Sequence, residues 1–141
     1  MTVADALFRC GFPYVKTLGM RRVTSGAVDV VPGSENIVYV LVRADIPIGG
    51  CCVRILNWDD EDLGTIGATG TADGSFEWPT KLLLDNDENL IVSDEALNRI
   101  TVMSKDGSFI SKFGEAGDKE GQLNRPSGMA FDKDDNLLIV D

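Results

Sequence analysis

A repeat of 47 residues organises the C-terminal half of this chain. When the segment that starts at Gly74 is laid over the sequence 47 positions later, glycine falls on glycine, proline on proline and acid on acid. The matched pairs are Gly74 and Gly121, Phe76 and Leu123, Pro79 and Pro126, Asp85 and Asp132, Asn89 and Asn136, and Asp94 and Asp141. A period of this length is typical of a stacked or radial array of small units. We therefore treat the chain as an array.

Each unit of the repeat reads as two β-hairpins. Apolar runs at 79–85 and 90–93 flank the turn-forming residues 86–89, and runs at 99–103 and 108–113 flank a second turn at 104–107. Short apolar runs separated by Asp, Asn, Ser and Gly are typical of antiparallel hairpins. The sequence therefore predicts four strands in each unit. It also predicts the first two strands of a further unit, at 129–131 and 137–140.

The order of these motifs resembles the NHL repeat, which forms one blade of a β-propeller. The chain has G-x-F-x-x-P from Gly74, apolar strands ending in Asp85 and Asp94, and then N-R-I, D-G and F-G-x-x-G between Asn98 and Gly117. The likeness covers residues 67–141 and is weaker before them. It implies an all-β fold, a partial β-propeller of four-stranded antiparallel blades. The four strands predicted from the apolar runs agree with that architecture.

Weaker copies of the unit precede the clear ones. Gly19, Gly67 and Gly114 follow equivalent runs and stand 48 and 47 residues apart. The unit between the first two of these glycines lacks the proline before its first strand, has what reads as an extra turn at Pro32–Ser34, and carries a longer loop at Arg43–Cys52. We expect its strands at 27–29, 37–41, 53–56 and 63–66.

The predicted strands add up to about three blades. The first and last of these units are half-blades. We expect an outer half-blade at 1–19 with strands at 6–10 and 14–18, complete blades at 20–67 and 68–114, and an inner half-blade at 115–141. Propellers close with roughly four to eight blades, so three should not form a ring alone. Two explanations stay open. Either the chain is a piece of a longer propeller, or two copies pair head to tail into a six-bladed homodimer in which the broken blades complete each other.

Charge and composition narrow the classes of function. The chain has 13 basic and 23 acidic residues and a net charge of -10, which opposes binding to a phosphate backbone. RNA binding is therefore disfavoured, and its candidate residues would be Arg21, Arg22, Arg43 and Arg125. No apolar run approaches a membrane span, and the first residues lack the basic and apolar regions of a signal peptide. We expect no membrane association and a cytoplasmic location.

Few residues of this chain suit catalysis or metal binding. The chain contains no histidine, which removes histidine-based metal sites and general bases. Its three cysteines, Cys10, Cys51 and Cys52, have no metal-ligand spacing and are interpreted as reduced, buried thiols. The D-x-D-x-N runs at Asp85 and Asp132 lack the glycine and the closing glutamate of a calcium loop, so we interpret them as turn-stabilising residues. We predict no cofactor and no metal.

The predicted binding face is the one on which the loops between strands two and three and the connections between blades open. The candidate binding residues there are Arg43, Asp45, Trp78, Asp94, Glu95, Asn98, Arg99, Arg125 and Asp141. We expect Asp94 and Arg99 to form a salt bridge that ties their loop together rather than to touch a ligand. Trp78 is either an exposed anchor of a binding site or a packing residue between blades. Phe76 and Leu123 should fill the core.

The sequence therefore predicts a non-catalytic module that binds a protein or peptide and acts as an interaction scaffold. The amidating lyases that share the repeat rely on histidine, so the residues do not support that activity. The first alternative is a metal-dependent, lactonase-like hydrolase of the six-bladed type, which would use Asp94 and Asp141 near the ring axis. RNA binding is the second alternative.

Overall fold

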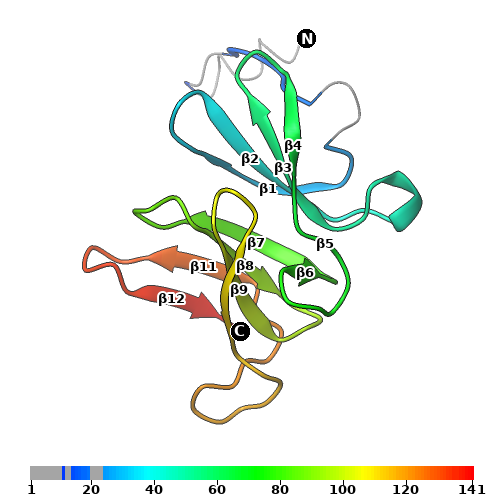
Figure 1. Cartoon of the computed structure of the whole chain (residues 1–141). Coiled ribbons are helices and arrows are strands. Elements are labelled where there is room, and N and C mark those ends of the chain that lie inside the picture. The colour runs from blue at the N-terminus through cyan, green and yellow to red at the C-terminus, as the bar shows by residue number, and fades with distance from the viewer. Residues whose placement is uncertain (1–10, 12–13, 20–23) are drawn as a thin grey trace.

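The computed structural model describes residues 11, 14–19 and 24–141, which form three antiparallel sheets lying side by side (Figure 1). The predicted all-β class is confirmed. Within this described portion, the helical structure is a single 3-10 turn, η1 (Ile46–Ile48), and no helix is long and apolar enough to cross a membrane.

Two sheets have four strands each, joined in chain order, and the third has two. The first sheet contains β1 (Ala27–Pro32), β2 (Ile37–Val42), β3 (Cys52–Asn57) and β4 (Asp62–Ile66). The second contains β7 (Pro79–Leu84), β8 (Leu90–Asp94), β9 (Arg99–Met103) and β10 (Phe109–Phe113). The third is the hairpin of β11 (Gly128–Phe131) and β12 (Leu137–Val140).

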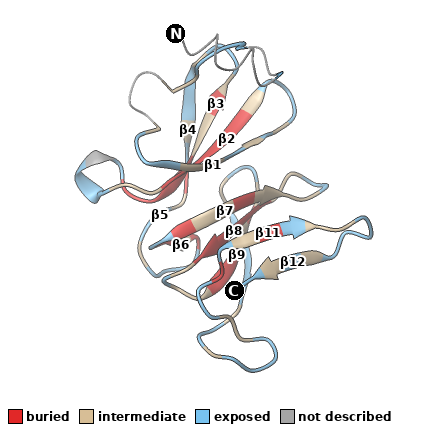
Figure 2. Ribbon diagram, turned by 180° about the vertical axis from the view of Figure 1, so that it is seen from behind, coloured by how far each residue is buried: buried red, intermediate tan, exposed pale blue. Residues whose placement is uncertain are grey.

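Burial explains why some strands are apolar throughout. All five residues of β8 are buried, and so are five of the six residues of β2, because both faces of each strand are covered. A strand covered on both faces reads as a continuous apolar run rather than an alternating one. Figure 2 shows the buried residues gathered on β2, β3, β8 and β9, whereas β12 has only intermediate and exposed residues.

The turn between the first two strands is built in the same way three times. The N–H of its first residue donates to the carbonyl four residues later. This bond joins Gly33 to Ile37 (3.0 Å), Asp85 to Asn89 (3.1 Å) and Asp132 to Asn136 (3.0 Å). The interpretation of Pro32–Ser34 as an extra turn is therefore wrong. It is the turn of the repeat, with glycine where the later copies have aspartate.

The connections between sheets repeat as well. In the first, β5 (Ala68–Thr69) pairs in parallel with β6 (Ser75–Phe76), and 47 residues later Ala116 bridges Leu123 in the same sense. Phe76 is fully buried and Leu123 packs partly buried in the next core cluster, as predicted. Gly67, with φ +77°, leaves room for the Phe76 side chain, because a Cβ at residue 67 would lie 2.3 Å from the Phe76 ring.

The first strands of successive sheets contact one another in the order β1, β7, β11. A carboxylate oxygen of Asp29 on β1 accepts a hydrogen bond from the Leu82 N–H on β7 (2.8 Å) and pairs with Lys81 Nζ (3.1 Å). The Thr80 hydroxyl on β7 donates to the Pro126 carbonyl just before β11 (3.1 Å). These polar contacts fix the inner edges of neighbouring sheets to one another.

The predicted strand at 14–18 is wrong, because the described residues 14–19 form no strand. This segment is held by the turn between β3 and β4. Lys16 Nζ donates to the Trp58 carbonyl, and the Gly19 N–H donates to a carboxylate oxygen of Asp60 (2.6 Å). Its hydrogen bonds therefore go to turn residues rather than to a strand edge. The predicted strand at 6–10 lies outside the described residues.

Candidate functional site

The turns and loops emerge on two opposite sides of the sheets. The β1–β2, β7–β8 and β11–β12 turns project to the left in Figure 1, whereas η1 and the β5–β6 connection project to the right. We name the second side the loop rim and define it as residues 43–51, 67–78, 95–98 and 114–127. It carries six of the nine predicted binding residues. The other three, Asp94, Arg99 and Asp141, adjoin it at the ends of β8, β9 and β12.

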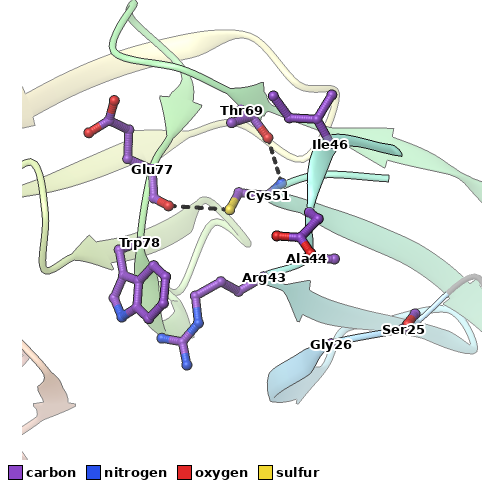
Figure 3. A pocket seen from close by; sticks show the side chains of 10 residues that line it. Ser25, Gly26, Arg43, Ala44, Ile46, Cys51, Thr69, Glu77 and Trp78 are labelled. Carbon is purple, nitrogen blue, oxygen red and sulfur yellow. Dashed lines mark hydrogen bonds between the residues drawn. The ribbon is translucent and has the colours of Figure 1, made fainter. Parts of the chain in front are cut away.

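Trp78 and Arg43 meet across the junction of the first two sheets. The Arg43 guanidinium carbon lies 4.2 Å from the centroid of a Trp78 ring, a cation–π contact. Arg43 comes directly after β2 and Trp78 directly before β7, so each sheet contributes one partner (Figure 3). Trp78 nonetheless stays 47% exposed. The ring thus contacts Arg43 of the neighbouring sheet and is accessible elsewhere, and its role as a binding anchor stays a prediction.

A hollow of about 440 Å³ opens beside this pair (Figure 3). Its wall on one side is the long loop after β2, whose Ile46 is largely exposed. Its polar lining includes one cation and two carboxylates, from Arg43, Asp45 and Glu77. The remaining lining residues are Ser25, Gly26, Ala44, Cys51, Thr69 and Trp78.

Cys51 lines this hollow and forms hydrogen bonds to two other residues that line it. Its N–H donates to the Thr69 hydroxyl (2.7 Å), and its thiol donates to the Glu77 carbonyl (3.4 Å). Burial raises the pKa of the Cys51 thiol, which keeps it in the neutral form that can donate. Cys51 and Cys52 are buried free thiols, as predicted. Cys10 lies outside the described residues.

A second pair joins the next two sheets at the equivalent positions. Arg125, 47 residues after Trp78, donates from Nε to a Glu95 carboxylate oxygen at 2.7 Å. Glu95 occupies the position equivalent to Arg43. The Glu95 N–H donates to the Trp78 carbonyl just before β7, and the Arg43 N–H donates to the Gly26 carbonyl just before β1. Trp78, Glu95, Ala96 and Arg125 line a hollow of about 250 Å³. Trp78 therefore stands between two hollows.

Asp94 is fully buried at the end of β8, and its carboxylate is occupied by backbone groups. It accepts hydrogen bonds from the N–H groups of Glu77 (2.7 Å), Trp78 (3.1 Å), Ala96 (3.1 Å) and Leu97 (3.1 Å). Asp141 repeats one of these contacts, since it accepts from the Asn124 N–H at 2.8 Å. The hydrogen bonds to Asp94 fix the backbone at Trp78.

The predicted salt bridge between Asp94 and Arg99 does not form. The Arg99 side chain, 7% exposed, instead donates to the carbonyls of Thr71 (3.0 Å), Ala72 (2.8 Å) and Ser75 (2.9 Å). The physical reason is hydrogen-bond satisfaction. Each buried charge finds several backbone partners, Arg99 at 71–75 and Asp94 at 77–78 and 96–97, and together these satisfy more buried polar groups than one ion pair would.

The opposite side also joins successive sheets by equivalent contacts. Glu88 accepts from the Ser34 hydroxyl (2.8 Å), and 47 residues later Asp135 accepts from Asn86 Nδ2 (3.1 Å). The hydrogen bonds from the Ser34 hydroxyl and N–H lower the pKa of Glu88, and Lys105 adds to the effect. In the Asp132 turn, hydrogen bonds from Asn136, followed by the Asp134 N–H, lower the pKa of that carboxyl.

The D-x-D-x-N run at Asp85 bonds the backbone of its own turn. The Asp85 carboxylate accepts from the N–H groups of Asp87 (2.9 Å) and Asn89 (2.8 Å), as expected for a turn-stabilising residue. Over residues 14–19 and 24–141, no group of three His, Cys, Asp or Glu side chains is arranged to hold a metal ion.

Several residues around Trp78 were missed from the sequence. Ile46, Cys51 and Thr69 line the larger hollow, and no local motif marks them. Only the length of the loop at 43–52 pointed there. Arg54 lies on β3, within the predicted strand at 53–56, and bonds the Thr65 hydroxyl (3.1 Å).

Comparison with known proteins supports NHL-like, β-rich repeats in this chain. No family model matches it. Protein lin-41 of Caenorhabditis elegans is 35% identical over 91 residues, which cover 58% of this chain and 8% of that protein. A crystal structure of a Bacteroides fragilis protein described as exported, itself all-β, matches with a TM-score of 0.61 at 18% identity, over 80% of this chain and 29% of the other. The chain therefore spans a small part of each.

Proposed function

We propose that this chain forms consecutive blades of an NHL-type β-propeller whose loop rim binds a protein or peptide. The repeat, the partial match to lin-41 and the two four-stranded antiparallel sheets support the assignment. So does the contact order β1, β7, β11, since inner strands of neighbouring blades lie together around a propeller axis. The resemblance to a solved structure at 18% identity supports the fold alone.

Trp78 is the observation that carries the binding proposal. Its ring is held in place by Arg43 on one side and by its own buried backbone contacts to Asp94. It remains half-exposed between hollows of about 440 and 250 Å³. A rigid, exposed aromatic side chain beside concave surface is the kind of residue that dominates the binding energy of protein interfaces.

The chemistry around Trp78 suits a peptide of mixed character. Ile46 and the indole offer apolar surface, and Asp45 and Glu77 can accept hydrogen bonds from peptide amides or cations. Arg43 has no acidic partner among the described residues, which leaves its guanidinium able to meet a carboxylate. An extended segment that combines an apolar side chain with a neighbouring acidic group would use all of these contacts.

The test is a selection of peptides from a displayed library on the whole chain, followed by affinity measurements on variants. We expect Trp78→Ala to weaken the selected peptides at least about tenfold, as for a hot-spot residue. Arg43→Ala should weaken those that carry an acidic residue. Trp58→Ala is the matched control, because Trp58 has a similar exposure of 45% but lies in the β3–β4 turn, where its N–H donates to the Asn36 carbonyl of the β1–β2 turn, away from the loop rim.

Three results would contradict the proposal. Peptides that bind Trp78→Ala and Trp58→Ala equally well would place binding elsewhere. Tight RNA binding that weakens steeply with salt and depends on Arg43 and Arg125 would support the RNA alternative. Saturable lactone hydrolysis that is lost in Asp94→Ala, with the fold intact by circular dichroism, would support the hydrolase.

A further inference from the structure

The larger hollow of the loop rim contains three charged side chains whose charges are not balanced. Arg43, Asp45 and Glu77 line it, and none of them belongs to an ion pair among the described residues. The Arg43 guanidinium stacks on Trp78, and the Asp45 side chain makes no capping hydrogen bond to the 3-10 turn that follows it. One cation and two carboxylates leave the hollow with one net negative charge.

This hollow lies between two complete sheets. Its lining residues come from the segment just before β1, from the loop at 43–51 and from the connection that leads into β7 (Figure 3). The first and second sheets each have all four of their strands. The smaller hollow beside Trp78 differs in charge, because there Arg125 balances Glu95. The excess of negative charge is therefore a property of the larger hollow.

The repeat does not require a carboxylate at Glu77. The equivalent positions in the other two units are Ser25 and Asn124, which are uncharged. What fixes the connection at this point is the Glu77 backbone, whose N–H donates to a carboxylate oxygen of Asp94 (2.7 Å). The Glu77 side chain is exposed, so its charge is available to a ligand.

Asp45 is likewise not needed for the fold of its loop. The loop at 43–51 has nine residues where the equivalent loop at 95–98 has four, and Asp45 lies in the longer one. Its backbone carbonyl accepts from the Gly50 N–H (3.1 Å), whereas its side chain is exposed. Both carboxylates of the hollow can therefore act on a bound molecule.

The Arg43 guanidinium has the geometry to bind two kinds of anion. Stacked on an aromatic ring, a guanidinium presents a rigid fork of N–H donors that fits a carboxylate or a phosphate. The charges around the fork distinguish these two anions. A phosphorylated side chain carries a charge of about −1.5 to −2, and an RNA strand is negative along its whole length. A peptide carboxylate carries a single charge, and a neighbouring lysine or arginine can approach Asp45 and Glu77.

We propose that Asp45 and Glu77 determine the specificity of this hollow. They repel phosphate groups from the Arg43 guanidinium, and they attract the basic residue of a mixed-charge peptide whose acidic residue binds Arg43. This inference rests on the proposed function, peptide binding by the loop rim, and names the kind of segment that the rim takes. Specific interfaces commonly combine an attractive group with a repulsive one that excludes the wrong ligand.

The first measurement needs no peptide. Acetate and inorganic phosphate are titrated into the whole chain, labelled with ¹⁵N, in about 0.1 M NaCl at about pH 7.5, where most phosphate is doubly charged. The Nε–H signal of Arg43 reports binding. We expect the wild-type chain to bind phosphate no more tightly than acetate. In Asp45→Asn combined with Glu77→Gln, the affinity for phosphate should rise at least about threefold relative to that for acetate, because a doubly charged ion gains more when two negative charges are removed.

Glu35→Gln combined with Asp87→Asn is the matched control. It removes the same number of charges from exposed side chains in the β1–β2 and β7–β8 turns, on the side opposite the loop rim. The affinity of Arg43 for both anions should stay within about 1.5-fold of the wild-type value, because salt at this concentration screens distant charges. Circular dichroism checks that both double variants are folded.

The second measurement is a selection from a displayed library of random peptides, made separately on the wild-type chain and on two variants. The wild-type chain should select peptides that carry an acidic and a basic residue. Asp45→Asn combined with Glu77→Gln should keep the acidic residue and lose the basic one, whereas Arg43→Gln should do the reverse. A wild-type peptide whose acidic residue is replaced by phosphoserine should bind the wild-type chain at least about threefold more weakly and the double variant with little loss.

The proposal is overturned if the ratio of phosphate to acetate affinity is the same in the wild-type chain and in Asp45→Asn with Glu77→Gln, or rises as much in the matched control. Selected peptides whose charges do not change between the variants would also overturn it, and so would an oligouridine that binds the wild-type chain and does not bind the double variant more tightly. Peptides that bind Trp78→Ala as tightly as the wild-type chain would instead contradict the function of the loop rim. In that case the anion titration still decides the role of Asp45 and Glu77.

Discussion

The two junctions between sheets share a backbone plan and differ in what they bury. The junction between the first and second sheets contains a cluster of ten buried residues, centred on Leu41, Phe76 and Leu90. The junction between the second and third sheets has only three buried residues, Ile91, Ile100 and Met129, with partly buried neighbours. The repeat therefore fixes turns, caps and connections, whereas the amount of burial depends on how many strands cover each face.

The contrast predicts unequal losses of stability when Phe76 and Leu123, the equivalent core residues of the two junctions, are replaced. This is the largest effect that we expect. Phe76→Ala removes a fully buried ring and should lower the free energy of unfolding by about 3 to 5 kcal/mol. Leu123→Ala removes a half-buried side chain and should cost about 1 to 2 kcal/mol. Chemical denaturation followed by circular dichroism measures both. Equal losses would show that the second junction is as well packed as the first.

Replacing the two equivalent aspartates, Asp94 and Asp141, should also cost more stability at the first junction than at the second. Asp94→Ala leaves the N–H groups of Glu77, Trp78, Ala96 and Leu97 without their acceptor in a buried place, and should cost about 2 to 4 kcal/mol. Asp141→Ala loses one exposed hydrogen bond and should cost about 0.5 kcal/mol. The measurement is again the free energy of unfolding. A mild Asp94→Ala would mean that water replaces the carboxylate at these amides.

The two pairs on the loop rim should respond differently to salt. Arg125→Ala removes an ion pair whose arginine is well exposed, so its cost of about 0.5 kcal/mol should vanish in about 1 M NaCl. Arg43→Ala removes a stacked guanidinium and its packing on Trp78, so its cost of about 0.5 to 1 kcal/mol should persist in salt. Unfolding curves at low and high salt compare them. Identical salt sensitivity would contradict the stacking.

Lowering the pH should reduce the stability of the protein through Glu88, which lies at the first junction on the side opposite the loop rim. The pKa of Glu88 is lowered from its ordinary 4.5 by the Ser34 hydroxyl and N–H. A lowered folded pKa contributes stability that is present above the unfolded pKa and is lost as the pH falls through the folded pKa. Glu88→Gln should therefore flatten part of the fall in stability between about pH 5 and 3. A variant curve parallel to the wild type would exclude this contribution.

The local parts of the fold could be predicted because they depend on short-range rules. The strands at 99–103 and 137–140 were predicted with their observed bounds, since apolar runs between Asp, Asn and Gly turns fix both ends. The strand at 14–18 was wrong because Lys16 and Gly19 bond a turn that lies about 40 residues further on. No local pattern carries that information.

The candidate site was harder to predict than the strands. Trp78 was singled out from its position before Pro79, but its pairing with Arg43 depends on how two sheets lie together. The expected bridge between Asp94 and Arg99 followed from their charges and spacing. No bridge forms because Arg99 donates to carbonyls at 71–75, whereas Asp94 accepts from N–H groups at 77–78 and 96–97.

The sequence by itself determined the period of the array, its strand order, its turn residues and the glycine before each plug, because all of these are set by backbone geometry within one unit. Only the tertiary structure decided which charges are satisfied by carbonyls or amides, and how Trp78 came to stand between two hollows. Those properties arise at junctions between units, where residues far apart in the sequence compete for the same partners.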